Sequence, residues 1–331
     1  MKKTKQHYIQ TVCVLLMIVI GIFVMSPIKT WASETKTYGD FKYCYNEEYG
    51  GIEILKYKGD AKTVKIPESI EGVPVKVIGS WGWQKKGAFT KNKTVKKVVI
   101  PESVVVIKEY SFAYCVELKA IKLPENLQQI GEFAIYGCEN LKAIKIPETL
   151  EFLSDACFAD TGLKEVVIPK NIRRMEDSFA GCKKLKKVTF EKNSNLKFMG
   201  MQAFIGCDSL TTIKIPKSVE TFEQEVFRNC SNLKTVTFEK GSKLRVVGYA
   251  SFEYCGNLRK ITFPASVEIV DQDVFDECKN LTKVSFEKES KLKEIGARCF
   301  MYCENLKAIT FKGPAPKIRT SAFSYVNPNL T

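Results

Sequence analysis

Cysteine is the residue type whose spacing in this sequence could carry chemistry. The string FAYCVELKAIKLP at 112–124 returns as IYGCENLKAIKIP at 135–147 and as FIGCDSLTTIKIP at 204–216. Thiolates can bind zinc, form disulfides or act as nucleophiles. No CxxC pair occurs, however, and two copies place Asn92 and Thr161 in the cysteine position. Cys, Asn and Thr are small and can bond to backbone, so we predict buried structural thiols. The repeat cysteines are Cys115, Cys138, Cys182, Cys207, Cys230, Cys255, Cys278 and Cys303.

Three further cysteines of the mature chain lie outside this column. Cys157 and Cys299 occupy a position that is otherwise Ala, Ser or Val, so we expect them to be small core residues. Cys44 has no evident partner. Thiols without a paired design suggest an environment in which thiols persist, although neighbouring copies could also form disulfides.

The sequence offers little for catalysis. Its one histidine, His7, lies in an N-terminal segment that we expect to be removed, which excludes histidine bases and ligands from the mature chain. No nucleotide-binding or hydrolase motif occurs in context. Acids recur at the ends of the expected strands, as a solvated rim, at Glu102, Glu125, Glu148, Glu191, Glu239 and Glu287. We therefore expect no enzyme, no cofactor and no metal site.

A repeat of about ten coils positions all of these residues. Its aromatic position, which we call the slot, recurs at steps of 21, 23 or 25 residues, and a period of this length is typical of a solenoid. The slot holds Phe89, Phe112, Ile135, Phe158, Phe179, Phe204, Phe227, Phe252, Phe275, Phe300 and Phe323. Each copy continues as Leu-x-x-Ile-x-Leu, and alternation places Ile121 and Leu123 on one face of a short strand. One coil cannot bury that face alone, so the coils must stack.

These residues resemble the leucine-rich repeats of the BspA-like, or Treponema pallidum, type. Those repeats follow IGxxAFxxCxxLxxIxIPxS, and MGMQAFIGCDSLTTIKIPKS stands here from Met199. The resemblance covers Ala61 to about Phe323. It implies an α/β-type leucine-rich-repeat solenoid with coils of 21–25 residues. Parallel strands would line the concave side, short helical or irregular segments the convex side, and the protein would bind host matrix proteins or other cells.

The two ends of the chain differ from the repeat. Lysines followed by the apolar run from Val12 to Met25 predict a signal peptide over residues 1–32. Its removal takes four lysines and lowers the formal charge from +14 to +10. Residues 33–60 are predicted to form an N-terminal capping hairpin, and residues 61–331 the solenoid. The last coil is either left open or belongs to a longer chain.

Basic residues recur on the expected concave face. The x positions of the repeat predict a partner-binding surface made of Lys96, Lys119, Lys122, Lys142, Lys145, Lys164, Lys186, Lys187, Lys214, Lys234, Arg259, Lys260 and Lys307. Lysines this regular can attract an acidic partner. They can equally keep a solenoid soluble by blocking its edges, and the sequence leaves both interpretations open.

An insertion in the first coil carries an alternative ligand site. SWGWQKKGA places Trp81, Trp83, Lys85 and Lys86 before the first slot residue. Two tryptophans beside lysines could stack against a sugar, or they could pack against the N-terminal segment. The leading hypothesis is an exported, adhesin-like monomer that binds an extracellular protein or an acidic glycan. The alternative is a carbohydrate-binding module, and no nucleic-acid or membrane partner is expected after signal cleavage.

Overall fold

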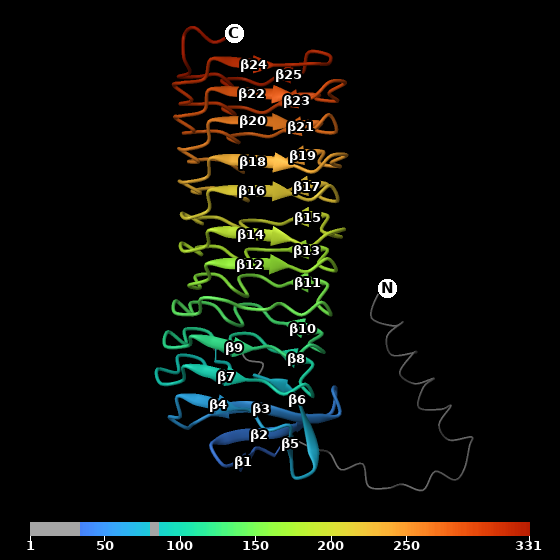
Figure 1. Ribbon diagram of the computed structural model, residues 1–331, viewed down its shortest axis with the longest axis vertical. Coiled ribbons are helices and arrows are strands. Elements are labelled where there is room, and N and C mark those ends of the chain that lie inside the picture. Colours follow the sequence, from blue (N-terminus) through green and yellow to red (C-terminus); the bar gives the residue numbers. More distant parts are fainter. Residues whose placement is uncertain (1–33, 80–85) are drawn as a thin grey trace, which may run out of the picture. The chain divides into compact units, whose positions relative to one another are not determined.

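The computed structural model describes residues 34–79 and 86–331 (Figure 1). The predicted signal peptide and residues 80–85 of the tryptophan insertion, which include Trp81, Trp83 and Lys85, lie outside the described residues. Residues 35–331 form one unit, a stack of coils. None of the described segments forms a helix with the length and apolar character of a membrane span.

Most coils contribute a strand to each of two sides of the stack. The long-strand side carries β4 (Thr63–Lys65), β7 (Lys97–Val99), β9 (Ala120–Lys122), β12 (Glu165–Ile168), β14 (Lys187–Phe190), β16 (Thr212–Ile215), β18 (Thr235–Phe238), β20 (Lys260–Phe263), β22 (Lys283–Phe286) and β24 (Ala308–Thr310). The short-strand side carries β6 (Val73–Ile78), β8 (Val106–Ile107), β10 (Gln129–Ile130), β11 (Phe152–Leu153), β13 (Arg174–Met175), β15 (Phe198–Met199), β17 (Thr221–Phe222), β19 (Val246–Val247), β21 (Ile269–Val270), β23 (Glu294–Ile295) and β25 (Lys317–Ile318).

The alternation of the repeat explains the long strands. In β12 the residues are exposed and buried in turn, and its buried Val166 lies in parallel register with the buried Val188 of β14. The predicted parallel-strand solenoid is confirmed. We number its coils 1 to 11 by the slot residue, from Phe89 to Phe323.

The segments around the slot residues are turns, so of the predicted short helical or irregular segments the helical ones are wrong for the described part of the chain. In coil 2 the amide nitrogens of Phe112 and Tyr114 donate to the next coil, each at 2.7 Å. They are therefore not available for the i−4 bonds of an α-helix. In coils 2 to 11 the residues two before and two after the slot have positive φ, as in Tyr110 (54°) and Tyr114 (58°). Bonds between coils, together with short-range bonds within a coil such as that from Cys115 to Phe112 at 3.2 Å, replace helical ones.

A ladder of aromatic rings fills the centre of the stack. The Phe179 ring lies 5.6 Å from that of Phe158 and 5.6 Å from that of Phe204, and both contacts are stacked. Stacked contacts of this kind continue to Phe323. Ile135 interrupts the ladder in coil 3, because it has no ring to stack.

The N-terminal strands extend the solenoid, and the predicted capping hairpin is not supported. β2 (Phe41–Asn46) is antiparallel to β1 (Lys36–Tyr38) and to β3 (Gly51–Tyr57). β3 pairs in parallel with β6, so β3 forms a first rung of the sheet. β5 (Ser69–Ile70) also pairs with β6. The Tyr57 ring stacks on Phe89 at 5.0 Å. The segment thus continues the core of the stack and is not a separate lid over coil 1.

Both sides of the stack are interrupted between coils 3 and 4. β10 and β11 are not paired, although the short-strand sheet is continuous from β11 to β25. On the long-strand side, residues 141–147 form no strand, although LKAIKIP differs from the LKAIKLP of coil 2 at one position. Backbone bonds persist in the turn segment, from Ile135 to Cys157 at 2.9 Å and from Gly137 to Ala159 at 2.9 Å.

Candidate interaction surface

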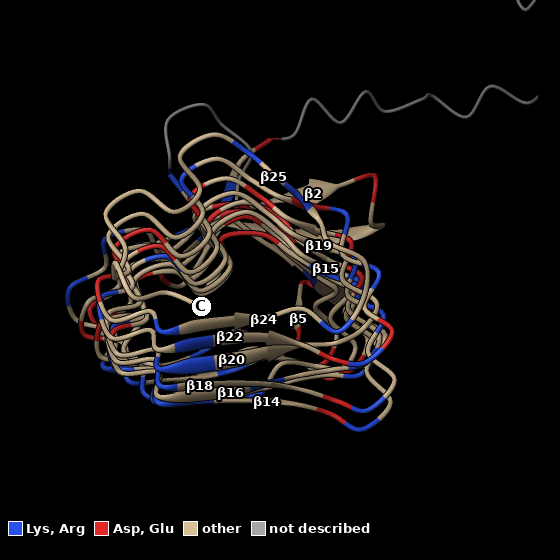
Figure 2. Cartoon of the chain, turned by 90° about the horizontal axis from the view of Figure 1, so that it is seen from above, with Lys and Arg blue, Asp and Glu red and all other residues tan. Residues whose placement is uncertain are grey.

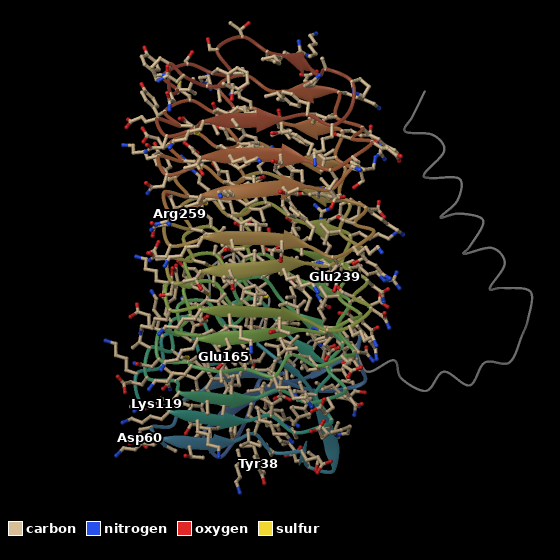
Figure 3. The ribbon with its side chains drawn as sticks, turned by 45° about the horizontal axis from the view of Figure 1, so that its top comes forward. Tyr38, Asp60, Lys119, Glu165, Glu239 and Arg259 are labelled. Atoms are coloured by element: carbon tan, nitrogen blue, oxygen red, sulfur yellow. The ribbon has the colours of Figure 1, made fainter. Side chains whose placement is uncertain are left out.

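The predicted basic residues gather where the long strands begin. One column follows the repeat leucines, and backbone hydrogen bonds join its members from coil to coil. The amide of Lys119 donates to Lys96 at 2.8 Å, and that of Lys186 donates to Lys164 at 2.8 Å. Figure 2 shows blue segments at these strand starts, and Figure 3 shows Lys119 and Arg259 along one edge of the stack. Neighbouring parallel strands are about 4.8 Å apart, so the cations follow one another closely.

Several of the predicted cations are engaged by glutamates. Lys122 and Lys145 lie 3.1 and 2.6 Å from carboxylate oxygens, and Lys96 and Lys214 lie 3.9 Å from theirs. These four contribute little free positive charge. Seven other predicted cations form no ion pair with any carboxylate of the described residues, and we call them the basic column. They are Lys119, Lys142, Lys164, Lys186, Lys234, Arg259 and Lys307.

Two predicted residues lie beside the basic column rather than in it. Lys187 and Lys260 begin β14 and β20, and both are exposed. Lys187 lies opposite Glu165 of β12, whereas Lys260 lies opposite Lys283 of β22. The long-strand side therefore brings the predicted cations together but leaves them unequally neutralised.

The acids at the strand ends hold the coils together, which the sequence analysis missed. It treated them as a solvated rim. Instead, a Glu102 carboxylate oxygen accepts the backbone amide of Glu125 in the next coil at 2.7 Å. This hydrogen bond, together with Lys122, lowers the pKa of Glu102. Corresponding bonds, each to a backbone amide of the preceding coil, are made by Glu191, Glu239 and Glu287.

The repeat cysteines form a ladder of hydrogen bonds. Each of the eight thiols donates to the carbonyl of the slot residue in the preceding coil, as from Cys115 to Phe89 at 3.0 Å. Burial raises the pKa of the Cys207 and Cys255 thiols well above the usual value. Such thiols are protonated at neutral pH and poorly nucleophilic. Within the described residues, no group of three His, Cys, Asp or Glu side chains could hold a metal ion.

The alternative ligand site falls mostly outside the described residues. Of its four members, only Lys86 is described, and it is exposed. The tryptophan hypothesis therefore stays a prediction.

A pocket that the sequence analysis did not anticipate lies at a corner of coil 4. It measures about 440 Å³, and Tyr136, Asp160 and Lys183 are among its lining residues. The one available signal was the 21-residue step between Phe158 and Phe179, where the repeat is shorter than elsewhere.

Comparison with known proteins identifies the family. The family model described as BspA type leucine rich repeat region (6 copies) matches residues 85–207, 153–282 and 197–329. The chain belongs to this family. No match was found among curated proteins.

Several solved structures are similar to this chain. A leucine-rich repeat protein of T. pallidum is 24% identical over 67% of this chain and 90% of its own, with a TM-score of 0.49. The pneumococcal vaccine antigen PcpA is 18% identical over 86% and 88%, with a TM-score of 0.45. A leucine rich cell surface protein of Faecalibacterium prausnitzii is 20% identical over 85% and 95%, with a TM-score of 0.38.

Proposed function

We propose that this chain is an exported, non-enzymatic, adhesin-like protein whose basic column binds an acidic extracellular protein or glycan. Membership of a leucine-rich-repeat family is consistent with a protein-interaction role. Solenoids of this kind present long, rigid surfaces to partners. Export is supported by the signal-peptide pattern of residues 1–32, which is a sequence argument.

The observation that carries the proposal is the unpaired state of the basic column. Like charges on adjacent strands destabilise a sheet, so such a column costs folding free energy. Glutamates neutralise Lys122 and Lys145, which follow Lys119 and Lys142 in the same repeat copies. Lys119, Lys142 and Lys164 have no such partner among the described residues. A surface that keeps its charges uncompensated is suited to an acidic partner, which would relieve the repulsion on binding.

The test is an array of sulfated glycans and extracellular matrix proteins, probed with residues 33–331 at two salt concentrations. We expect binding that weakens steeply with salt, because exposed charges are screened beyond about 8 Å at physiological ionic strength. A single exposed pair contributes roughly 0–1 kcal/mol, so one substitution will change little. Reversal of Lys119, Lys142, Lys164 and Lys186 to Glu together should abolish detectable binding.

A matched control keeps the total charge change equal. Reversal to Glu of four exposed loop lysines outside the column, Lys192, Lys240, Lys288 and Lys312, should leave most of the binding intact. If both fourfold variants lose binding equally, net charge and not the column is responsible. If binding is insensitive to salt and is lost in Trp81→Ala or Trp83→Ala, the insertion is the site and the proposal is wrong.

A further inference from the structure

The corner pocket exists because coil 4 lacks a residue that its neighbours have. Between the cysteine position and the repeat leucine, coil 3 has Glu139 and Asn140, and coil 5 has Lys183 and Lys184. Coil 4 has only Gly162 there. A Cβ on Gly162 would lie 2.1 Å from the Glu139 carbonyl oxygen, so this close approach requires glycine. The shortened corner of coil 4 leaves a recess between the longer corners of coils 3 and 5. Lys184 spans this recess by donating to the Glu139 carbonyl at 3.4 Å.

Two glycines keep the recess open. The position two after the slot has positive φ and points outward in every coil, and it is Tyr114, Gly137, Asp160 and Gly181 in coils 2 to 5. A Cβ on Gly181 would lie 2.1 Å from an Asp160 carboxylate oxygen, and one on Gly137 would lie 3.1 Å from the Tyr114 ring. Both glycines have φ near +67°, a conformation that side chains rarely adopt. Their absent side chains leave Asp160 and the tyrosine rings accessible.

Aromatic surface forms one wall of the recess. The rings of Tyr114 and Tyr136 meet edge to face, 5.1 Å apart, and Tyr114 is 41% exposed. Phe133 packs against Tyr136 at 5.5 Å, which fixes the wall from behind. Tyrosine combines an apolar ring with a polar tip, so the wall can contact a ligand that has both apolar and hydroxyl surfaces.

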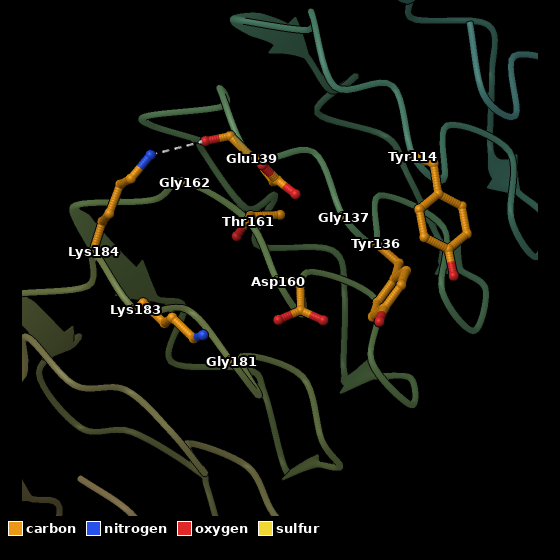
Figure 4. A pocket seen from close by; sticks show the side chains of 10 residues that line it. All are labelled: Tyr114, Tyr136, Gly137, Glu139, Asp160, Thr161, Gly162, Gly181, Lys183 and Lys184. Atoms are coloured by element: carbon orange, nitrogen blue, oxygen red, sulfur yellow. Dashed lines mark hydrogen bonds between the residues drawn. The ribbon is translucent and has the colours of Figure 1, made fainter. Parts of the chain in front are cut away.

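An acceptor and a donor face each other beside this wall. Figure 4 shows Asp160 and Lys183 pointing into the space next to Tyr136. Neither has an ion-pair partner among the described residues. The nearby Asp160 carboxylate, with partial burial, raises the pKa of the Tyr136 phenol, so the phenol stays neutral. A carboxylate accepts and an ammonium donates, and one charge offsets the other.

We propose that this corner pocket binds one neutral sugar unit, with its apolar face on Tyr136 and Tyr114 and neighbouring hydroxyls between Asp160 and Lys183. Adjacent hydroxyls offer a donor and an acceptor at once, which is what this pair requires. A pocket of about 440 Å³ is within the range of small-ligand sites. Lys183 would repel a cation and Asp160 would repel an anion, so an uncharged ligand fits best. This site is separate from the basic column and does not depend on the function proposed for it.

The experiment uses an array of neutral hexose and N-acetylhexosamine oligosaccharides, with titration calorimetry on the best ligand. We expect binding that changes little between about 0.05 and 0.5 M salt, since the ligand carries no charge. Asp160→Asn and Lys183→Ala should each weaken it at least tenfold. The matched control Glu277→Gln changes the equivalent position in coil 9 and should leave the affinity unchanged.

A second variant restores the missing residue. Replacement of Gly162 by the dipeptide Glu-Asn, as found in coil 3, should fill the recess and abolish sugar binding. If no neutral sugar binds, or if the restored corner and Asp160→Asn both bind normally, the proposal is overturned. The fourfold lysine reversal tests the other surface: it should leave neutral-sugar binding unchanged, whereas Asp160→Asn should leave salt-sensitive binding unchanged. Failure of one proposal is thus distinguishable from failure of the other.

Discussion

The junction of coils 3 and 4 and the block of coils 5 to 10 are built from the same repeat but differ in ring stacking and in strand pairing on the short-strand side, although the long-strand side is also interrupted between β14 and β16 and between β18 and β20. In the block, rings stack continuously and the short-strand sheet is unbroken. At the junction, both sheets stop, Ile135 replaces a ring, and Thr161 donates to the carbonyl of its own Phe158 at 2.7 Å instead of reaching the preceding coil. Two pockets lie at the junction, one at the coil 4 corner and the other between Ile144 and Val167. Small departures from the repeat therefore convert a purely structural array into one with recesses.

The largest expected difference concerns the slot residues. The Phe227 ring is fully buried and lies 5.7 and 5.4 Å from the rings of Phe204 and Phe252. Phe227→Ala should cost about 3–5 kcal/mol, and Ile135→Ala only about 2 kcal/mol, because fewer atoms are lost where the packing is already interrupted. Urea unfolding measures both. Equal costs would show that the junction is packed as tightly as the block.

Hydrogen exchange tests the backbone side of the same comparison. Amides of residues 143–146 should exchange about a hundredfold faster than those of residues 235–238, because only the latter belong to a paired strand. Mass spectrometry of overlapping peptides gives the two rates. Similar protection in both segments would mean that coil 3 forms the same ladder in solution as coil 7.

The cysteine ladder gives a smaller effect. Cys207→Ala removes a buried thiol and its hydrogen bond to Phe179, and should cost about 1–3 kcal/mol. Cys44→Ala is the control, because Cys44 is buried but outside the ladder, and it should cost less. Iodoacetamide should label the ladder thiols only after denaturation. Fast labelling of Cys207 in the native protein contradicts this prediction.

The smallest effect is on pH dependence within the regular block. Burial, with Asp276 and Asp273 nearby, raises the pKa of Glu253 to about 7 despite the opposing effect of Arg228. A carboxyl group with a raised pKa binds a proton more tightly in the folded state, so its contribution to stability falls as pH rises from about 4 to about 7. Glu253→Gln should therefore raise the melting temperature at pH 8 but not at pH 5. A larger loss at pH 8 than at pH 5 would show that the contact with Arg228 dominates.

Much of the fold could be predicted because the same residue pattern recurs in many copies along the chain. Slot spacing and the alternation of Ile121 and Leu123 predict stacked coils with parallel strands. The turns were harder to predict, since Tyr110 and Tyr114 have positive φ without being glycine, and that conformation is accompanied by bonds to the next coil that spacing does not reveal. The 21-residue step was visible, but its consequence depended on which side chains it left facing one another. Spacing alone also could not show that strand-end glutamates accept backbone amides from adjacent coils.

The direction of the hydrogen bonds between coils has a mechanical consequence. They run along the stack, so tension between its ends would load the interfaces in series and open one after another. The interface with fewest bonds yields first. Between coils 3 and 4, the turn segment retains its bonds while both sheets are interrupted. Under load, the chain should part there into two blocks of coils that each keep their own core.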